Sequence, residues 1–521
     1  MTRPHDALMD APDRLPASPQ AAGPTPSSAG GGCHGGRETM LAAAEAAGKG
    51  EALAKLAADY PRGPHDQPQS MCPAFGSLRV GLRMRRAATI LCGSACCVYG
   101  LTFTSHFYGA RRSVGYVPFN SESLVRGELY EDIRDAVFQT AEGGEYDVVV
   151  VINLCVPTAS GVPLDRLPKQ VGSARIIGID VPGFGVPTHA EAKDVLAGAM
   201  LRYARTEAED GPVQRPRGLP AGGAGPAVAL IGEMFPADPV GVAALLAPMG
   251  LSVAPQLPAR EWRDLYAVLD CAVAAAVHPF YTAAIRELET AGRPIVGSGP
   301  VGVEGTAAWL DAVGRAAGVT AAQVDAAKAR ALPPIQGILD AGRIAARVTV
   351  SGYEGSELLV ARLLAEVGCE VPYVGTACPR TPWSDADREW LEARGTHVQY
   401  RASLEQDLAA MRDVQPDLAI GTTPLVQKAK ELGIPAIYFT NMVSARPLLG
   451  AAGAGAVPAI VRTQTAGRER FGRMVSFFGS VGSGEGTGYG WQGVPVSPPG
   501  AKERYRKARE ARAKAESAVG S

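Results

Sequence analysis

Three cysteines in the first third of the chain have the residue type and the setting for metal chemistry. Cys72, Cys97 and Cys155 are separated by 25 and 58 positions, and each stands beside small or turn-forming residues. Thiolates are preferred ligands of iron–sulfur clusters, which normally take four protein ligands. Three thiols from three loops therefore predict a cluster that is completed from outside the chain. Buried structural cysteines remain the alternative on spacing alone, because a free thiol packs like a small hydrophobe and no compact CxxC pair is present.

Length, composition and charge exclude several classes of protein. The chain has 521 residues, enough for two to four domains, and its net charge of −1 gives no reason to expect nucleic acid or an acidic membrane surface. The start lacks the apolar segment of a signal peptide, so the nine cysteines are expected as reduced thiols in the cytoplasm. The longest apolar stretch, residues 87–103, is too short and too broken by Gly, Ser and Thr to span a bilayer.

The two ends of the chain differ in composition from the middle. Residues 1–68 form a low-complexity tail, expected to be disordered apart from one helix at 40–60. Cys33 and His34 lie in its glycine-rich part, where a ligand role is not expected. Residues 479–521 are interpreted as a glycine-rich loop followed by a charged, solvated helix at 501–516.

The middle of the chain predicts open parallel sheets. The β-branched run at 146–154 predicts a buried strand with Cys155 at its carboxyl end, followed by a strand at 175–180, a turn at 182–185 and a helix at 194–204. A Pro/Gly/Ala linker at 212–226 marks a boundary. Residues 228–253 and 347–371 then repeat the order strand, loop, helix, glycine, strand. We therefore expect a cluster-binding α/β domain at 69–222 and two further α/β domains at 223–340 and 341–478.

The chemistry that is missing is also informative. The sequence contains no P-loop, no H-E-x-x-H zinc motif and no G-x-S-x-G nucleophile elbow. Cysteines, α/β lobes and few polar catalytic groups favour electron transfer over hydrolysis.

Several segments resemble the nitrogenase-like catalytic components over about residues 70–480, and most closely the Y-type subunits of chlorophyllide a reductases. Cys72, Cys97 and Cys155 match, in order and approximate spacing, three cysteines of the nitrogenase α-subunit and of the N subunit of dark-operative protochlorophyllide reductase. The C-G-x-x-x-C pattern at 92–97 resembles the latter and puts Cys97, rather than Cys96, at the ligand position. The segments at 148–157, 179–184, 228–253 and 421–435 resemble further parts of the family.

The resemblance implies three Rossmann-like lobes of the nitrogenase component 1 type. It implies a [4Fe-4S] cluster bound by Cys72, Cys97 and Cys155, with remaining ligation from a homologous Z subunit in a heterotetramer. A separate ATP-hydrolysing iron–sulfur reductase, the X component, would deliver electrons, so ATP would not bind here. The implied reaction is reduction of the C7=C8 bond of chlorophyllide a in light-independent bacteriochlorophyll synthesis. Where nitrogenase holds its catalytic cofactor by a cysteine, this chain has no cysteine at 275–279, which implies an apolar tetrapyrrole pocket instead.

The strand-end loops at 232–235, 278–281, 352–354 and 421–424 are the expected walls of that pocket. Glu233, His278 and Glu354 are candidate catalytic groups there, and helix capping is the alternative for the two acids. Two other functions stay open: a cluster-assembly scaffold of the same superfamily, and a small-molecule binding protein with merely buried cysteines.

Overall fold

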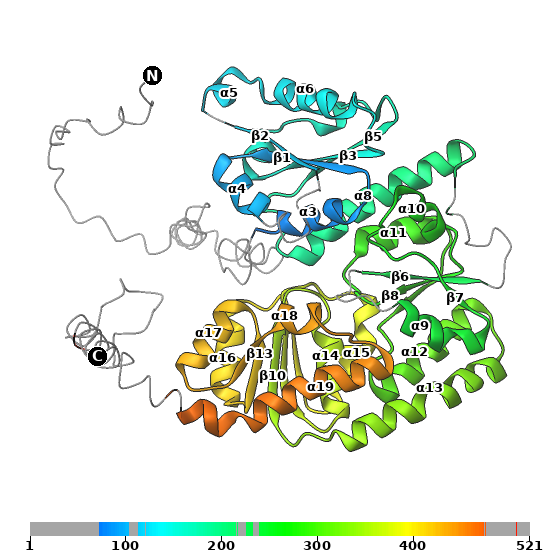
Figure 1. Cartoon of the computed structure of the whole chain (residues 1–521), viewed down its shortest axis with the longest axis vertical. Coiled ribbons are helices and arrows are strands. Elements are labelled where there is room, and N and C mark those ends of the chain that lie inside the picture. The colour runs from blue at the N-terminus through cyan, green and yellow to red at the C-terminus, as the bar shows by residue number, and fades with distance from the viewer. Residues whose placement is uncertain are drawn as a thin grey trace, which may run out of the picture. The chain divides into compact units, whose positions relative to one another are not determined.

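The computed structural model describes residues 72–103, 113–119, 121–214, 216, 226–232, 239–473, 475 and 507. The expected N-terminal tail at 1–68 lies outside the described residues, as does the segment at 479–521 apart from residue 507. Within the described part, three separate sheets alternate with helices along the chain (Figure 1). The fold class is therefore the expected α/β arrangement of mostly parallel sheets.

The first sheet has the strand order β2-β1-β3-β5-β4, and every neighbouring pair is parallel except β4 and β5. Its strands are β1 (Ala87–Gly93), β2 (Ser113–Pro118), β3 (Val148–Asn153), β4 (Gln170–Val171) and β5 (Ala174–Asp180). Its helices are α3 (Ala74–Arg83), α4 (Ala95–Phe103), α5 (Ser121–Arg126), α6 (Leu129–Ala141), α7 (Cys155–Ala159) and α8 (His189–Asp210).

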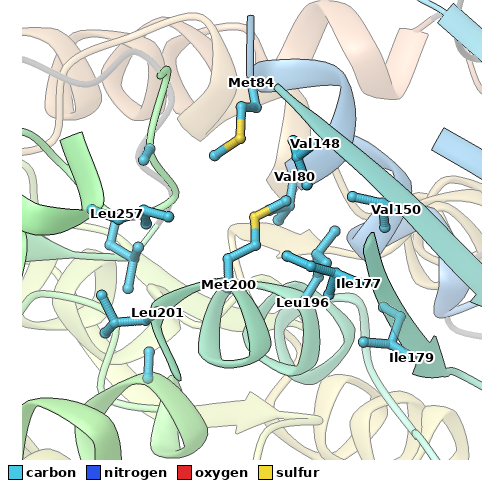
Figure 2. Close-up of a cluster of buried hydrophobic side chains, with 14 of the residues drawn as sticks. Val80, Met84, Val148, Val150, Ile177, Ile179, Leu196, Met200, Leu201 and Leu257 are labelled. Atoms are coloured by element: carbon cyan, nitrogen blue, oxygen red, sulfur yellow. The ribbon is translucent and has the colours of Figure 1, made fainter. Parts of the chain in front are cut away.

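The central strand β3 is buried along its whole length because helices cover both faces of the sheet. Val148 and Val150 point into a core shared with α3 and α8, and Figure 2 shows them with Val80 and Met200 of those helices. Val149, on the opposite face, packs against α6. A strand covered on both faces gains apolar burial at every position, which explains its uninterrupted β-branched run.

The second sheet is wholly parallel and has the order β7-β6-β8-β9. Its strands are β6 (Ala227–Ile231), β7 (Ser252–Val253), β8 (Val273–Ala276) and β9 (Ile295–Gly297). Helices α9 (Pro239–Leu246), α12 (Gly302–Ala317) and α13 (Ala321–Ala341) cover one face. Helices α10 (Trp262–Leu269) and α11 (Thr282–Thr290) cover the other, where the core continues across α8 into the first sheet.

The third sheet is also wholly parallel and has the order β12-β11-β10-β13-β14. Its strands are β10 (Arg347–Gly352), β11 (Glu370–Thr376), β12 (His397–Tyr400), β13 (Leu418–Gly421) and β14 (Ala436–Tyr438). Its helices are α14 (Glu357–Glu366), α15 (Asp385–Glu392), α16 (Leu404–Val414), α17 (Thr423–Glu431), α18 (Phe439–Ser444) and α19 (Gly450–Ala466). The expected repeat is confirmed, because β6-α9-β7 and β10-α14-β11 are both parallel β-α-β units.

Each sheet reverses its direction of growth at one point. In the first sheet, β2 lies on one side of β1 and β3 lies on the other side. The same reversal occurs between β6 and β8 in the second sheet and between β10 and β13 in the third. In open α/β sheets, ligands bind beyond the carboxyl ends of the strands at such switch points. The residues that follow these three strand pairs are therefore the expected positions of ligand-binding groups. Within the described part of the chain, no helix combines the length and apolarity that a membrane span requires.

Candidate metal centre

Cys97 and Cys155 follow the two strands that form the switch point of the first sheet. Strands β1 and β3 run in parallel register, with Cys92 opposite Asn153 at their carboxyl ends. Helix α4 begins two residues after β1 and contains Cys97, whereas α7 begins at Cys155 itself. The backbone N–H of Leu154 donates to the carbonyl of Cys92 at 2.9 Å and extends the pairing beyond the strands. Both cysteines therefore stand at the same edge of one sheet.

Cys72 reaches this region through α3. Its carbonyl accepts the N–H of Phe75 at 3.1 Å, which places it at the start of the helix. Helix α3 contacts β1, β3 and α4. Cys72 and Cys97 both pack against the hydrophobic core that lies between the first sheet and α8. The helix thus holds Cys72 on the core that also supports Cys97.

The thiols of the described residues fall into groups that differ in burial. Cys72, Cys97 and Cys155 are half-buried, and Cys96 is exposed. The buried thiols, whose pKa values are all raised by burial, are Cys92, Cys271 (to about 11), Cys369 (to about 12) and Cys378. Because the metal ligand is the thiolate, raised pKa values disfavour the buried group as ligands. The three cysteines singled out by the sequence are those that are neither fully enclosed nor fully exposed.

Cys96 and Cys97 are adjacent on α4 but have different surroundings. The Sγ atom of Cys96 lies 2.8 Å from the Oγ atom of Ser94 and is exposed, and this hydrogen bond lowers the pKa of the Cys96 thiol. Cys97 is partly covered by the core. The lowered pKa favours the thiolate form of Cys96, whereas the core that Cys97 shares with Cys72 favours Cys97, the ligand that the sequence pattern indicates. Cys97 as the ligand therefore stays a prediction.

A backbone donor is aimed at Cys155. The N–H of Gly183 lies 3.2 Å from Cys155 Sγ, in the turn that follows β5. Strand β5 is the parallel neighbour of β3, so this turn stands at the same carboxyl edge. Hydrogen bonds to ligand sulfurs are among the features that set the reduction potential of an iron–sulfur cluster. The turn at 182–185 therefore contributes to the electrostatics of this edge as well as to its shape.

The surface beside these cysteines is apolar. Helix α4 has no charged residue in its sequence, and Tyr99 on it is 76% exposed. Phe184, next to the donor of the Cys155 hydrogen bond, is 50% exposed. Large exposed aromatic side chains near a candidate site are typical of a surface that another protein covers.

The donor atoms at this edge are thiol sulfurs, which are the usual protein ligands of iron–sulfur clusters. Among the described residues, no three His, Cys, Asp or Glu side chains gather closely enough to hold one metal ion. Three half-buried thiols on elements that meet at one sheet edge, with an N–H donor to one of them, are a donor set of the kind that binds iron–sulfur clusters. Convergence of the three sulfur atoms on one cluster stays a prediction.

Glu354, a candidate catalytic acid, follows β10 at the switch point of the third sheet. Its carboxylate lies 2.8 Å from Lys193 Nζ and 3.7 Å from an Nη atom of Arg79, and all three side chains are buried. Burial alone would raise the pKa of Glu354, but the two cations outweigh it and hold the pKa well below its usual range. Glu354 is therefore ionised at neutral pH, which disfavours it as a proton donor.

His278 and the loops expected to line a pocket lie against one another. A Cβ atom at Gly232 would lie 2.4 Å from His278 Cβ, and one at Gly355 would lie 2.9 Å from the ring of Phe280. Thr381 Oγ1 donates to the carbonyl of Pro279 at 2.9 Å. The loop at 278–281 thus joins the second sheet to the strand-end loops of the third. Glu233 lies outside the described residues.

Sequence reasoning missed a group of buried charges in this region. Lys193 and Arg79 were not singled out because cations on amphipathic helices normally face solvent. Glu357 is buried and accepts hydrogen bonds from the N–H groups of Glu354 (2.8 Å) and Gly355. Burial raises the pKa of Glu357 to about 7. The one available signal was the pair of glutamates three residues apart directly after a buried strand.

A cavity of about 920 Å³ opens at the opposite, amino-terminal edge of the first sheet. Its lining combines aromatic side chains, Trp262 and Tyr266, with charged residues that include the ion pairs Arg86–Asp147 at 2.9 Å and Arg175–Glu207 at 2.7 Å. This cavity lies at the edge of the sheet opposite Cys97 and Cys155, away from the strand-end loops that are expected to line the substrate pocket.

Comparison with known proteins adds to this geometry. Residues 72–459 match the family described as nitrogenase component 1 type oxidoreductase. The chain is 61% identical to the chlorophyllide reductase 52.5 kDa chain of Cereibacter sphaeroides, over 98% of this chain and 99% of that one. It is 62% identical to the chain of the same name from Rhodobacter capsulatus, over 93% and 97%.

A solved structure of nitrogenase, Nitrogenase Cp1 at pH 6.5, superposes with a TM-score of 0.62 over 77% of this chain and 93% of that one. At 16% sequence identity, this likeness concerns the fold alone. The family match covers more than half of the chain, and two full-length relatives exceed 60% identity. The chain therefore belongs to the nitrogenase component 1 type oxidoreductases.

Proposed function

We propose that this chain is the Y-type catalytic-component subunit of a chlorophyllide a reductase, which reduces the C7=C8 bond of chlorophyllide a in bacteriochlorophyll synthesis. One observation carries the proposal: the 61% identity to a chlorophyllide reductase chain extends over nearly the full length of both proteins. The resemblance of the cysteine pattern to cluster-binding members of the family supports it.

In this proposal Cys72, Cys97 and Cys155 bind a [4Fe-4S] cluster, and a homologous Z subunit supplies the remaining ligation. The half-buried state of these thiols and the exposed Tyr99 beside them support a centre that is closed by a second chain. Obligate interfaces bury about 2,000–5,000 Å² and resemble a protein core cut in half. The surface around α4 is the face that we assign to the Z subunit.

Reduction of one C=C bond consumes two electrons and two protons. A bound iron–sulfur cluster supplies one-electron transfer, and a separate ATP-hydrolysing iron–sulfur reductase would provide the electrons. This chain's own residues hold the thiolates at one sheet edge, donate the Gly183 N–H to the Cys155 sulfur and exclude water by packing the strand-end loops. Glu354 keeps its negative charge among two cations, so we do not assign it the proton transfer.

The test is anaerobic co-expression of the chain with its candidate partner subunit, followed by iron and sulfide analysis. Turnover of chlorophyllide a is then measured with the reductase component and ATP. Cys97→Ala should lose the cluster and the turnover. Cys96→Ala, a change at the preceding position of the same helix, should keep both. The wild-type complex should consume chlorophyllide a and form the product reduced at C7=C8.

Three outcomes contradict parts of the proposal. A complex that contains iron and sulfide but does not reduce chlorophyllide a would favour the cluster-assembly scaffold. A complex without iron and sulfide would leave a small-molecule binding protein with structural cysteines. Loss of the cluster in Cys96→Ala, with Cys97→Ala unaffected, would overturn the ligand assignment.

A further inference from the structure

Helix α8 begins beside the candidate metal centre and reaches the third sheet within two turns. The loop before it contains Gly183, whose N–H donates to Cys155. Glu191 forms two hydrogen bonds of 2.6 Å with the guanidinium of Arg401, which follows β12. One short stretch of chain thus links the cysteine-bearing edge of the first sheet to the third sheet.

A second ion pair in the same turns is fully enclosed. Lys193 Nζ lies 2.8 Å from Glu354, and the side chains of Lys193, Glu354 and Arg79 are 1%, 6% and 7% exposed. Desolvating three charged groups is costly, and apolar residues of similar volume often give equal or greater stability. Stability alone is therefore a poor explanation for this ion cluster. A role in fixing one arrangement of the packed elements explains it better.

The three charged residues lie on elements next to the candidate metal centre and next to the expected substrate pocket. Arg79 lies on α3, which begins two residues after Cys72, and Lys193 lies on α8. The two helices are in close contact, because a Cβ atom at Gly76 would lie 2.2 Å from the carbonyl oxygen of His189. Glu354 belongs to the switch-point loop of the third sheet. The cations therefore sit on a closely packed helix pair, and the anion sits on a loop that we expect near the substrate.

We propose that Arg79, Lys193 and Glu354 are positioning residues that fix the 353–355 loop of the third sheet against the cysteine-bearing edge of the first sheet. They thereby set the distance over which an electron passes from the metal centre to the substrate. This inference rests on the proposed function for the identity of the substrate. The ion cluster itself does not depend on that function, because it is formed by side chains of this chain alone.

The test compares Lys193→Met, Glu354→Gln and the double variant with Arg202→Met in the complex with the partner subunit. Arg202 is a matched control, because it lies on the same helix and pairs with Glu287 at 2.7 Å, yet its side chain is 63% exposed. The readouts are iron and sulfide content, kcat and KM for chlorophyllide a, and amide hydrogen exchange at 182–188 and 352–356. Lys193→Met leaves Glu354 paired with Arg79 at 3.7 Å, so it keeps one buried cation with one buried anion, whereas the double variant leaves Arg79 without the Glu354 carboxylate.

Lys193→Met, Glu354→Gln and the double variant should keep the cluster and speed hydrogen exchange in both segments. Their kcat should fall about tenfold to a hundredfold with little change in KM, because a misplacement of about 1 Å has a cost of that size. Arg202→Met should leave every readout unchanged. Wild-type kcat and exchange in the double variant would overturn the proposal, because the charges would then only protect folding. If the double variant fails to fold, Lys193→Met decides, because it keeps the Arg79–Glu354 pair, and wild-type kcat and exchange in that variant overturn the proposal.

If the wild-type complex holds iron but does not turn over chlorophyllide a, the proposed function fails while the exchange comparison still decides the positioning role. Faster exchange at both segments in Lys193→Met, but not in Arg202→Met, supports the linkage between the sheets. Unchanged exchange at both segments overturns it.

Discussion

Two glycine-to-alanine changes on the helices that hold the candidate ligands should have opposite effects on stability. Gly76 lies on α3, four residues after Cys72, and Gly100 lies on α4, three residues after Cys97. In a helix interior, alanine is favoured over glycine by about 0.5–1 kcal/mol. A Cβ atom at Gly100 meets nothing within 4 Å, so Gly100→Ala should raise the free energy of unfolding by about that amount.

Gly76→Ala gains the same backbone contribution but meets an obstacle. Its Cβ atom would lie 2.2 Å from the carbonyl oxygen of His189, so α3 and α8 must move apart. Overpacking of a well-packed core costs about 1–3 kcal/mol. Because the backbone contribution cancels between the two variants, the steric cost alone should separate their free energies of unfolding.

The assay is urea unfolding of the purified chain, followed by intrinsic fluorescence, with iron content of the assembled complex as a second measurement. Gly76→Ala should unfold at a lower urea concentration than Gly100→Ala and should bind less iron, since α3 places Cys72. If Gly76→Ala were as stable as Gly100→Ala, α3 would not pack on α8 as described.

Three further predictions concern the cysteines, the apolar surface and pH. Gly183→Pro removes the N–H donor to Cys155 and should lower the midpoint potential of the bound cluster by tens of millivolts, as measured by redox titration; an unchanged potential would contradict Cys155 as a ligand. Tyr99→Asp should weaken association with the partner subunit in analytical ultracentrifugation without changing the unfolding of the isolated chain, and undiminished association would place the interface elsewhere. The folded-state pKa of Glu354 is depressed, so its contribution to stability is complete above its ordinary value of 4.5 and is lost as the pH falls toward the folded-state pKa. Glu354→Gln should therefore lose less stability than the wild type between about pH 6 and about pH 3, and equal losses would refute the ion cluster.

Much of the fold could be predicted from local patterns. The β-branched run at 146–154 predicted the central strand, found at Val148–Asn153, because a strand covered on both faces needs apolar residues throughout. The helix expected at 194–204 is longer, His189–Asp210, because Thr188 caps it through the N–H of Glu191 at 3.1 Å. A cap that lies beyond the periodic core of a helix is a weak signal in a single sequence.

The candidate ligands could be predicted from the sequence because their order and approximate spacing resemble those of three cysteines in the nitrogenase-like family. What the sequence could not supply was the contrast in burial between Cys97 and the other thiols, or the hydrogen bond from Gly183 to Cys155. Both depend on strands that are adjacent in the sheet but distant along the chain.

By itself, the sequence determined the types of elements, the repeated β-α-β unit and the three candidate cysteines. These features follow from short-range periodicity and turn chemistry, which act over a few residues. The sequence placed all three cysteines in loops, whereas Cys97 lies on α4 and Cys155 begins α7. Only the tertiary structure decided that Arg79, Lys193 and Glu354 meet in one enclosed cluster and that Glu354 is held ionised. The reason is physical: whether a charged side chain faces solvent or another charge depends on which helices pack together, and that choice is made over more than two hundred residues of chain.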